Sequence, residues 1–234
     1  MEYFIWLLKD ILWPKKCYSC KKEWHFFCRQ CLSKIQKYED KCYLCKKQTK
    51  DFVLHTKCRQ LVYFDQVIIL SHYKEKIIKK LIKDWKFYWK KDIFEELWLY
   101  LYELFKSIYK DIKNKQDYIV VSSPMSFFRK LKRWYNQSYI LAKSFSNHSG
   151  IYYEKNLINK TINTRQQSKL NKLDRMKNLK KSFKINDKYI DMIDNKTIIF
   201  IDDVISTWTT LNEISKVLKK SWAKKIIWLI VASD

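Results

Sequence analysis

Four pairs of potential metal ligands lie in the first quarter of the chain, each pair with two residues between its members. The pairs are Cys17 and Cys20, Cys28 and Cys31, Cys42 and Cys45, and His55 and Cys58. Eight such ligands are the number that two tetrahedral zinc ions require. Because they fill all eight coordination positions and leave none for water, both sites are expected to be structural. The spacing fits sequential assignment, first four and last four, and it also fits a cross-braced arrangement. A set of redox thiols is the alternative, but the histidine completes the count of eight.

A second group of polar residues follows a predicted buried strand, Ile198–Ile201. Asp202 and Asp203 come directly after this strand, and the run from Ser206 to Thr210 leads into a predicted helix. Ligands bind at the carboxyl ends of strands in open α/β sheets. Hydroxyl and backbone N–H groups at a helix N-terminus bind phosphate, and adjacent carboxylates hold Mg²⁺ or accept from sugar hydroxyls. The alternative is a solvated strand end followed by an ordinary capping segment.

The residues from Phe200 to Thr210 resemble the phosphoribosyl pyrophosphate loop of type I phosphoribosyltransferases. That motif has two apolar residues, Asp-Asp, two further residues, and then Ser-Thr-Gly-x-Thr. The chain matches it at every place except Trp208. A glycine at this place lets the backbone close on the 5′-phosphate, whereas an indole would fill the phosphate cradle.

The glycine and tryptophan contents are the reverse of those in ordinary chains. The 234 residues include ten Trp and one Gly, although glycine normally makes up about 7% of a chain. Trp24, Trp208 and Trp222 stand where turns or close backbone approach favour glycine, whereas Trp228 lies in an apolar setting that suits tryptophan. We hypothesise UGA recoding to Gly, with the printed sequence showing tryptophan at those codons. The alternative is a tryptophan-rich core.

Beyond about residue 65, apolar runs alternate with segments of helical period. Strands are predicted over Val67–Leu70, Tyr118–Val121, Ile198–Ile201 and Ile226–Val231. Helices are predicted around Ile77–Ile82, from Asp92 as N-cap to Ile112, over Gln137–Phe145 and over Leu211–Leu218. This alternation predicts an α/β fold with a parallel sheet and helices on both faces, beside a small N-terminal zinc-binding module. The resemblance of the Phe200–Thr210 loop implies that the sheet is type I phosphoribosyltransferase-like. We place the zinc-ribbon-like module, with an N-terminal helix, at residues 1–62 and the larger domain at 63–234.

The formal net charge of +24 indicates a phosphate-rich partner. A solvated lysine surface without a specific partner is the alternative. The cysteine pairs fit metal binding in a reducing compartment, and the apolar run Tyr3–Leu8 is interrupted by Lys9 and Asp10, which is not typical of an export signal. No apolar run reaches the length of a transmembrane segment. We therefore expect a cytoplasmic protein.

Further motifs extend the resemblance over nearly the whole chain. They are the run Leu7–Pro14, the segment Arg133-Trp134-Tyr135-Asn136-Gln137, and the spacings Thr164-x2-Gln167-x2-Leu170 and Arg175-x2-Asn178. Together with the loop above, they resemble the ComF family, whose members carry an N-terminal double zinc ribbon on a phosphoribosyltransferase-like domain. The family motif Arg-Gly-Phe-Asn-Gln again has glycine where this chain has tryptophan. The chain departs from the family at Ser122-Ser123-Pro124, where the family has Pro-Val-Pro.

The resemblance implies a role for each matching residue. Asp202 and Asp203, the expected catalytic residues, would contact the ribose hydroxyls or the Mg²⁺ that accompanies phosphoribosyl pyrophosphate. The expected substrate- and phosphate-binding residues are Ser206, Thr207, Trp208, Thr209, Thr210, Arg133, Asn136, Gln137, Gln167, Arg175 and Asn178. The first five would surround the 5′-phosphate, the next three would line the same pocket, and the last three would belong to a mobile segment that covers it.

The resemblance also implies a function. It is that of a competence factor that binds phosphoribosyl pyrophosphate and assists the cytoplasmic handling of incoming single-stranded DNA in natural transformation, with a competence helicase or channel protein as partner. One alternative is a phosphoribosyltransferase of the glycosyltransferase class, acting on a nucleobase or amine. The other is a non-catalytic zinc- and DNA-binding protein, which literal tryptophans at 134 and 208 would require.

Overall fold

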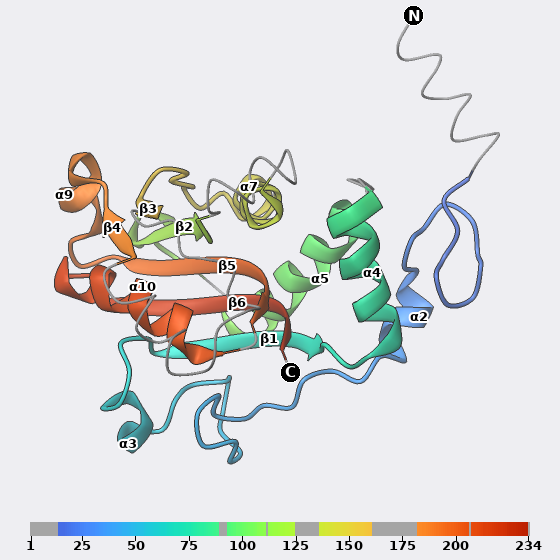
Figure 1. The fold of residues 1–234 in the computed structure, drawn as a ribbon, viewed down its shortest axis with the longest axis horizontal. Helices are drawn as coiled ribbons and strands as arrows, with labels where there is room; N and C mark the ends of the chain where they lie inside the picture. Colours follow the sequence, from blue (N-terminus) through green and yellow to red (C-terminus); the bar gives the residue numbers. More distant parts are fainter. Residues whose placement is uncertain are drawn as a thin grey trace, which may run out of the picture.

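A four-stranded parallel sheet forms the centre of the protein. The computed structural model describes residues 14–88, 93–110, 112–124, 136–160, 182–205 and 207–233. The sheet strands are β1 (Gln66–His72), β2 (Tyr118–Ser122), β5 (Thr197–Ile205) and β6 (Lys225–Ser233). They lie in the order β1-β6-β5-β2, and every neighbouring pair is parallel (Figure 1). The predicted α/β class and parallel sheet are therefore confirmed.

The central strands are apolar along their length because both of their faces are covered. Every residue of β6 from Ile226 to Ser233 is buried. Phe200 of β5 and Trp228 of β6 are register partners, and their ring centroids lie 4.1 Å apart. The Trp228 indole N–H donates to the Ser215 hydroxyl at 3.0 Å, which satisfies the one polar group of this buried side chain.

Helices cover both faces of the sheet. Helices α4 (Lys76–Tyr88), α5 (Ile93–Ile108) and α7 (Gln137–Ser149) follow β1 and β2, and α5 and α7 pack together through Phe105 and Phe145. Helix α10 (Trp208–Lys220) joins β5 to β6 on the opposite face (Figure 1). The helices lie on the faces where right-handed connections between parallel strands would place them. Within the described residues, no helix has the length and hydropathy to cross a bilayer.

Several predicted boundaries differ from the structure, among them the ends of β5 and α5. The strand predicted to end at Ile201 continues to Ile205, because β6 offers hydrogen-bonding partners as far as Ser233. The two aspartates therefore lie inside β5, close to its carboxyl end. The helix expected to reach Ile112 ends at Ile108, and its expected N-cap, Asp92, lies outside the described residues, as does the expected N-terminal helix.

Smaller elements complete the described fold. A two-stranded antiparallel sheet pairs β3 (Ile158–Lys160) with β4 (Phe183–Ile185). The remaining elements are α2 (Arg29–Ser33), α3 (Thr56–Arg59), η1 (Lys115–Asp117), η3 (Asp187–Tyr189) and α9 (Ile190–Ile193). Helices α2 and α3 belong to the cysteine-rich segment, which lies along the β1 side of the sheet (Figure 1).

The cysteine-rich segment covers the free edge of β1. Lys37 forms an antiparallel bridge with Ser71, and the Tyr38 N–H donates to the Leu70 carbonyl at 3.2 Å. The Ser71 hydroxyl in turn donates to the Gln36 carbonyl at 2.8 Å. These bonds occupy edge groups that would otherwise be open to pairing with another chain.

Two of the tryptophans have backbone conformations that favour glycine. Trp24 has φ of 72° and Trp222 has φ of 65°. Trp222 follows the C-cap of α10, where its N–H donates to Lys219 and the next N–H, of Ala223, donates to Leu218. This is the Schellman pattern, in which glycine is the usual left-handed residue. The Trp222 side chain is 77% exposed, so no burial offsets the strain.

The third tryptophan at which glycine is expected, Trp208, has a different backbone geometry. Trp208 is the first residue of α10 and has ordinary helical backbone. The case for glycine at this position therefore rests on the close approach of a phosphate rather than on backbone strain. Trp228, by contrast, is fully buried and hydrogen-bonded, as expected of a true tryptophan.

We predict that Trp222→Gly stabilises the protein, because a left-handed residue with a Cβ costs about 1–2 kcal/mol. The matched change Trp228→Gly removes a buried indole and should destabilise by at least about 3 kcal/mol. Urea unfolding of the two variants measures both effects. A loss of stability in Trp222→Gly would show that the indole makes a needed contact.

Candidate zinc centres and phosphate site

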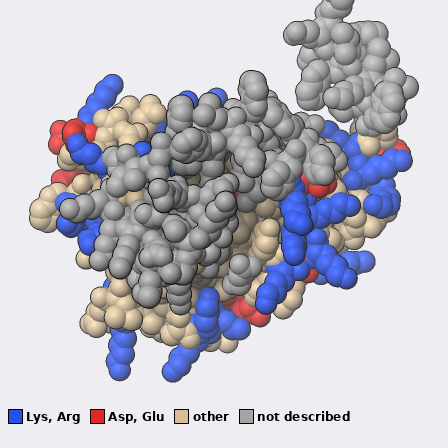
Figure 2. All heavy atoms as spheres, in the orientation of Figure 1, with Lys and Arg blue, Asp and Glu red and all other residues tan. Residues whose placement is uncertain are grey.

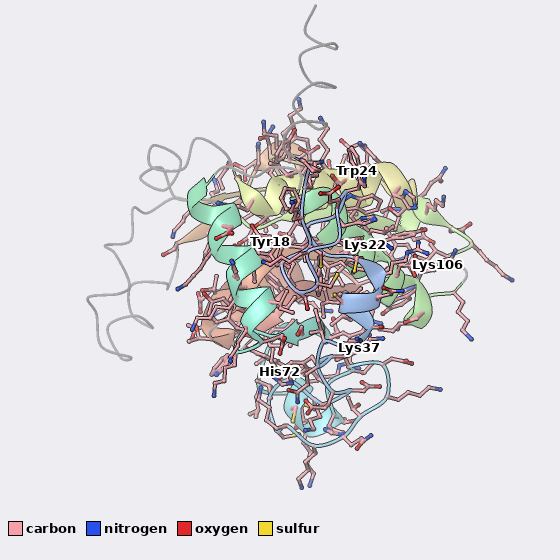
Figure 3. All side chains as sticks on the ribbon, turned by 90° about the vertical axis from the view of Figure 1, so that its right-hand side faces the viewer. Tyr18, Lys22, Trp24, Lys37, His72 and Lys106 are labelled. Carbon is pink, nitrogen blue, oxygen red and sulfur yellow. The ribbon has the colours of Figure 1, made fainter. Side chains whose placement is uncertain are left out.

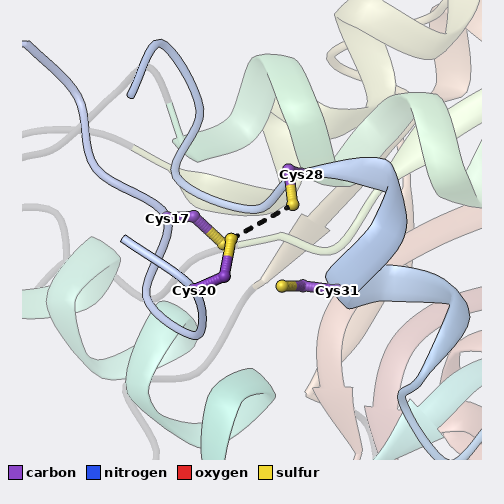
Figure 4. A group of neighbouring side chains, drawn as sticks. All are labelled: Cys17, Cys20, Cys28 and Cys31. Carbon is purple, nitrogen blue, oxygen red and sulfur yellow. Dashed lines mark hydrogen bonds between the residues drawn. The ribbon is translucent and has the colours of Figure 1, made fainter. Parts of the chain in front are cut away.

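The first four cysteines converge on one point. The Sγ atoms of Cys17, Cys20, Cys28 and Cys31 all lie within 4.8 Å of one another (Figure 4). Cys28 is the N-cap of α2 and Cys31 lies inside that helix, so one short helix presents two ligands. The Cys20 and Cys28 sulfurs are 3.6 Å apart. A tetrahedral ion with Zn–S bonds of about 2.3 Å needs sulfurs about 3.8 Å apart, so the cluster fits zinc.

The last four ligands form a second cluster of the same size. The ligand atoms of Cys42, Cys45, His55 and Cys58 also lie within 4.8 Å of one another. The His55 Nδ1 atom is 3.3 Å from the Cys45 sulfur, while its Nε2 atom lies 3.1 Å from the Gln48 carbonyl oxygen. An N–H donated to that carbonyl would leave Nδ1 as the metal ligand.

The grouping of the ligands is therefore sequential, and the cross-braced arrangement is not what the structure shows. Each group could hold one zinc ion, and the ion would cross-link the parts of the segment that carry its four ligands. In each group, one cysteine is exposed, Cys20 in the first and Cys45 in the second. His25 is exposed and does not belong to the first group.

The two centres are built from a repeated segment that the sequence reasoning missed. Residues 16–23 read KCYSCKKE and residues 41–48 read KCYLCKKQ, 25 positions later. The backbone repeats as well. The N–H of the first cysteine donates to the carbonyl of Lys22 or Lys47 at 2.9 Å, and Lys21 and Lys46 have φ of 65° and 61°. A search for internal similarity would have found this repeat.

The repeat also gives equivalent cysteines the same electrostatic environment. Burial acts to raise the pKa of Cys17, but backbone N–H groups of Cys28, Cys20 and Ser19 outweigh it and lower that pKa to about 6. The pKa of Cys42 is lowered to about 6 in the same way. Burial instead raises the pKa of Cys28 and of Cys58 to about 11. Zinc binding would therefore release protons from each cluster, because the ligands bind as thiolates.

We predict that zinc loss in one cluster leaves the other cluster loaded. The double variant Cys20→Ser/Cys31→Ser should bind one zinc ion instead of two, because both changes fall in the same group. Metal content measured by mass spectrometry under native conditions tests this. A variant without any zinc would contradict the grouping, since a cross-braced arrangement assigns these two cysteines to different ions.

The two aspartates near the carboxyl end of β5 are held by α7 and by the backbone of β5 itself. Asp202 Oδ1 accepts from the Ser138 hydroxyl at 2.6 Å and from the Asp203 N–H at 2.9 Å. Asp203 Oδ1 accepts from the Val204 N–H at 2.7 Å. Ser138 is a residue that sequence reasoning missed, although it directly follows the motif that ends at Gln137. It anchors one aspartate to the start of α7.

The surroundings of Asp202 raise the pKa of its carboxyl group. Burial, with a smaller contribution from the charge of Asp203, raises the pKa of Asp202 to about 6. Bonds from Ser138 and from the backbone oppose this rise without cancelling it. A divalent cation placed between the carboxylates would remove the repulsion and favour the charged form of both.

The predicted motif residues at the start of α7 lie beside this acidic pair. The Asn136 amide donates to the Ser123 carbonyl at 3.0 Å, which joins α7 to the loop that follows β2. Gln137 is 3% exposed, and its amide nitrogen has no hydrogen-bond acceptor among the described residues. A buried donor without an acceptor is costly, and a ligand oxygen would relieve that cost.

The phosphate-loop residues are described only in part. Thr207 is the N-cap of α10, and Trp208, Thr209 and Thr210 form its first turn, where free backbone N–H groups favour an anion. The remaining predicted binding residues, Ser206, Arg133, Gln167, Arg175 and Asn178, lie outside the described residues. The structure thus brings Asp202, Asp203, Asn136 and Gln137 to one edge of the sheet.

We predict that Asp202→Asn raises stability at pH 7.5 by up to about 2 kcal/mol and has little effect at pH 4. The folded-state pKa is above that of the unfolded chain, so the native aspartate costs stability as pH rises through about 4 to 6, and this cost stays constant above that range. Thermal unfolding of both proteins between pH 4 and 8 measures the difference. A pH-independent difference would contradict the raised pKa.

Comparison with known proteins bears on the family resemblance. No model of a known protein family matches the chain. Competence protein F of Haemophilus influenzae is 29% identical over 215 residues, which are 91% of this chain and 88% of that protein. The aligned region covers both the zinc-binding segment and the sheet, given its length. The resemblance to the ComF family that the sequence motifs predicted is thereby confirmed.

Proposed function

We propose that the protein is a competence factor that binds phosphoribosyl pyrophosphate and handles single-stranded DNA during uptake. The similarity to a competence protein over nearly the whole chain supports the competence role. One observation supports phosphoribosyl pyrophosphate as the ligand. Asp202, Asp203 and Gln137 lie near the carboxyl end of β5, next to the first turn of α10.

Each described group has a distinct task in this proposal. Asp203 and Asp202 would hold Mg²⁺ or accept from the ribose hydroxyls, and the cation would neutralise charge on the pyrophosphate. The N–H groups of Thr209 and Thr210 would bind the 5′-phosphate together with the helix dipole. The buried Gln137 amide would donate to a ligand oxygen.

The charge of the chain supports a polyanionic partner. With 48 basic and 24 acidic residues, the protein attracts phosphates in a way that does not depend on nucleotide sequence. Such attraction suits incoming single strands, which carry no fixed sequence. We also propose that the protein acts in the cytoplasm with a competence helicase or channel protein.

The ligand is tested by calorimetric titration of phosphoribosyl pyrophosphate in the presence of Mg²⁺. We expect Trp208→Gly to bind phosphoribosyl pyrophosphate at least about tenfold more tightly than the protein with tryptophan at position 208, because the indole occupies the first turn of α10 at the anion site. Trp222→Gly is the matched control and should not change binding. Asp203→Asn, made in the Trp208→Gly background, should weaken binding by at least about tenfold.

Failure of every variant to bind phosphoribosyl pyrophosphate would overturn the ligand proposal and leave a zinc- and DNA-binding protein. Release of pyrophosphate in the presence of a nucleobase or amine would instead establish phosphoribosyltransferase activity. In that case the acidic pair would be catalytic, since transfer from C1 of the ribose develops charge that Mg²⁺ and the pocket stabilise.

A further inference from the structure

A cleft opens between the first zinc centre and helix α5, and neither residue of the acidic pair lines it. Its volume is about 410 Å³. Its lining residues are Lys22, His25, Cys28, Arg29, Gln30, Leu99 and Tyr100. The first five come from the zinc-binding segment and the last two come from α5, so the cleft exists only where these two parts meet.

The walls of the cleft differ in chemistry. Lys22, His25, Arg29 and Gln30 are exposed and offer nitrogen donors. The α5 wall is apolar and aromatic, formed by Leu99 and Tyr100. A cationic wall facing an aromatic wall suits a ligand that carries a phosphate on one side and a flat ring on the other.

The aromatic wall is held in place. The Tyr100 hydroxyl donates to the Phe27 carbonyl at 3.0 Å, and the Tyr100 and Phe27 rings meet edge to face with centroids 6.4 Å apart. Phe27 directly precedes Cys28, a zinc ligand. The ring that a base would contact is therefore positioned by the zinc centre, and little ordering is needed when a ligand binds.

Basic residues continue from the cleft over the neighbouring surface. Exposed cations on the described part of α4 include Lys76, Lys79, Lys80 and Lys83. The first zinc loop contacts this helix through Tyr18, whose hydroxyl bonds Asp84 and whose ring lies 5.0 Å from the Lys80 nitrogen. Figure 2 shows Lys and Arg side chains gathered over this side of the molecule. Figure 3 faces the same side and labels Lys22, Trp24 and Lys106.

From this arrangement we infer that the cleft binds one nucleotide of a single-stranded nucleic acid, with the base against Tyr100 and Leu99 and the adjoining phosphates on Lys22 and Arg29. The α4 lysines would contact the phosphates of the nucleic acid outside the cleft. The inference rests on the proposed function for the identity of the strand as DNA, and it adds the surface on which that strand lies.

The cleft favours a single strand over a duplex. A base enters a cleft between two walls only when its ring faces are free, and in a duplex that requires unpairing and flipping. A duplex would retain only the phosphate contacts. We therefore expect single strands to be bound more tightly than duplexes at the same salt concentration.

The internal repeat provides a charge-matched test. Lys22 and Lys47 hold equivalent places in the repeat and have the same backbone hydrogen bond, but only Lys22 lines the cleft. We compare Lys22→Glu/Arg29→Glu with Lys47→Glu/Lys57→Glu, which makes the same charge change on exposed residues of the second zinc-binding loop. Fluorescence anisotropy with labelled oligo-dT, across a range of salt concentrations, measures affinity and salt dependence.

We expect the cleft variant to bind oligo-dT at least about tenfold more weakly than the matched variant. The slope of log affinity against log salt concentration should be smaller in magnitude by about one to two. Tyr100→Phe keeps the ring and should bind within about threefold of the wild type, whereas Tyr100→Ala should lose about tenfold. Two zinc ions per chain in every variant would show that the fold of the zinc-binding segment is intact.

The outcomes separate the two proposals. Equal weakening in the cleft and matched variants would overturn the cleft as the binding site while leaving the DNA-handling function standing. No binding of oligo-dT by the wild type would overturn the DNA-handling function as well. Equal affinity for oligo-dT and duplex would contradict base binding in the cleft, and tighter binding of oligo-U than of oligo-dT would identify RNA as the strand.

Discussion

One buried carboxylate connects the second half of the zinc-binding segment to the central sheet and to a helix that covers it. Asp65 is 5% exposed, and its oxygens accept from Arg59 at 2.6 Å, from the Ile226 N–H at 2.8 Å and from Lys219 at 3.0 Å. A carboxylate removed from water is tolerated only when it is paired in this way. Its three donors belong to α3, β6 and α10. One side chain thus fixes the second cysteine-rich cluster relative to the central strand β6 and to helix α10.

Sequence patterns predicted the parts of the fold in which local signals and tertiary packing agree. The four strands of the main sheet were visible as apolar runs because each is buried on both faces. The β3 and β4 pair was not predicted, since strands of three residues such as Ile158–Lys160 are too short to show a period. The end of β5 was misplaced because Asp202 and Asp203 disfavour a strand locally, whereas pairing with β6 extends it.

The candidate sites show the same division between chemistry and geometry. Ligand types and spacing predicted eight zinc ligands, but spacing alone fits two connectivities, and only the folded positions of Cys28 and His55 separate them. The acidic pair was visible in the sequence. The Ser138 bond to Asp202 and the cleft beside Tyr100 were not, because each joins residues from elements far apart in the chain.

The order of the strands in the chain bears on how the protein folds during synthesis. The edge strands β1 and β2 come first, and the central strands β5 and β6 lie beyond residue 196. Neither edge strand has its neighbour in the sheet until the ribosome has made most of the chain. The ligands of each zinc cluster, by contrast, lie within 17 residues of one another, so ion capture closes only short loops. Zinc could therefore fold the first segment before β5 and β6 have been synthesised. During that period β1 and β2 are unpaired in the sheet, and a nascent chain with unpaired apolar strands is prone to aggregation.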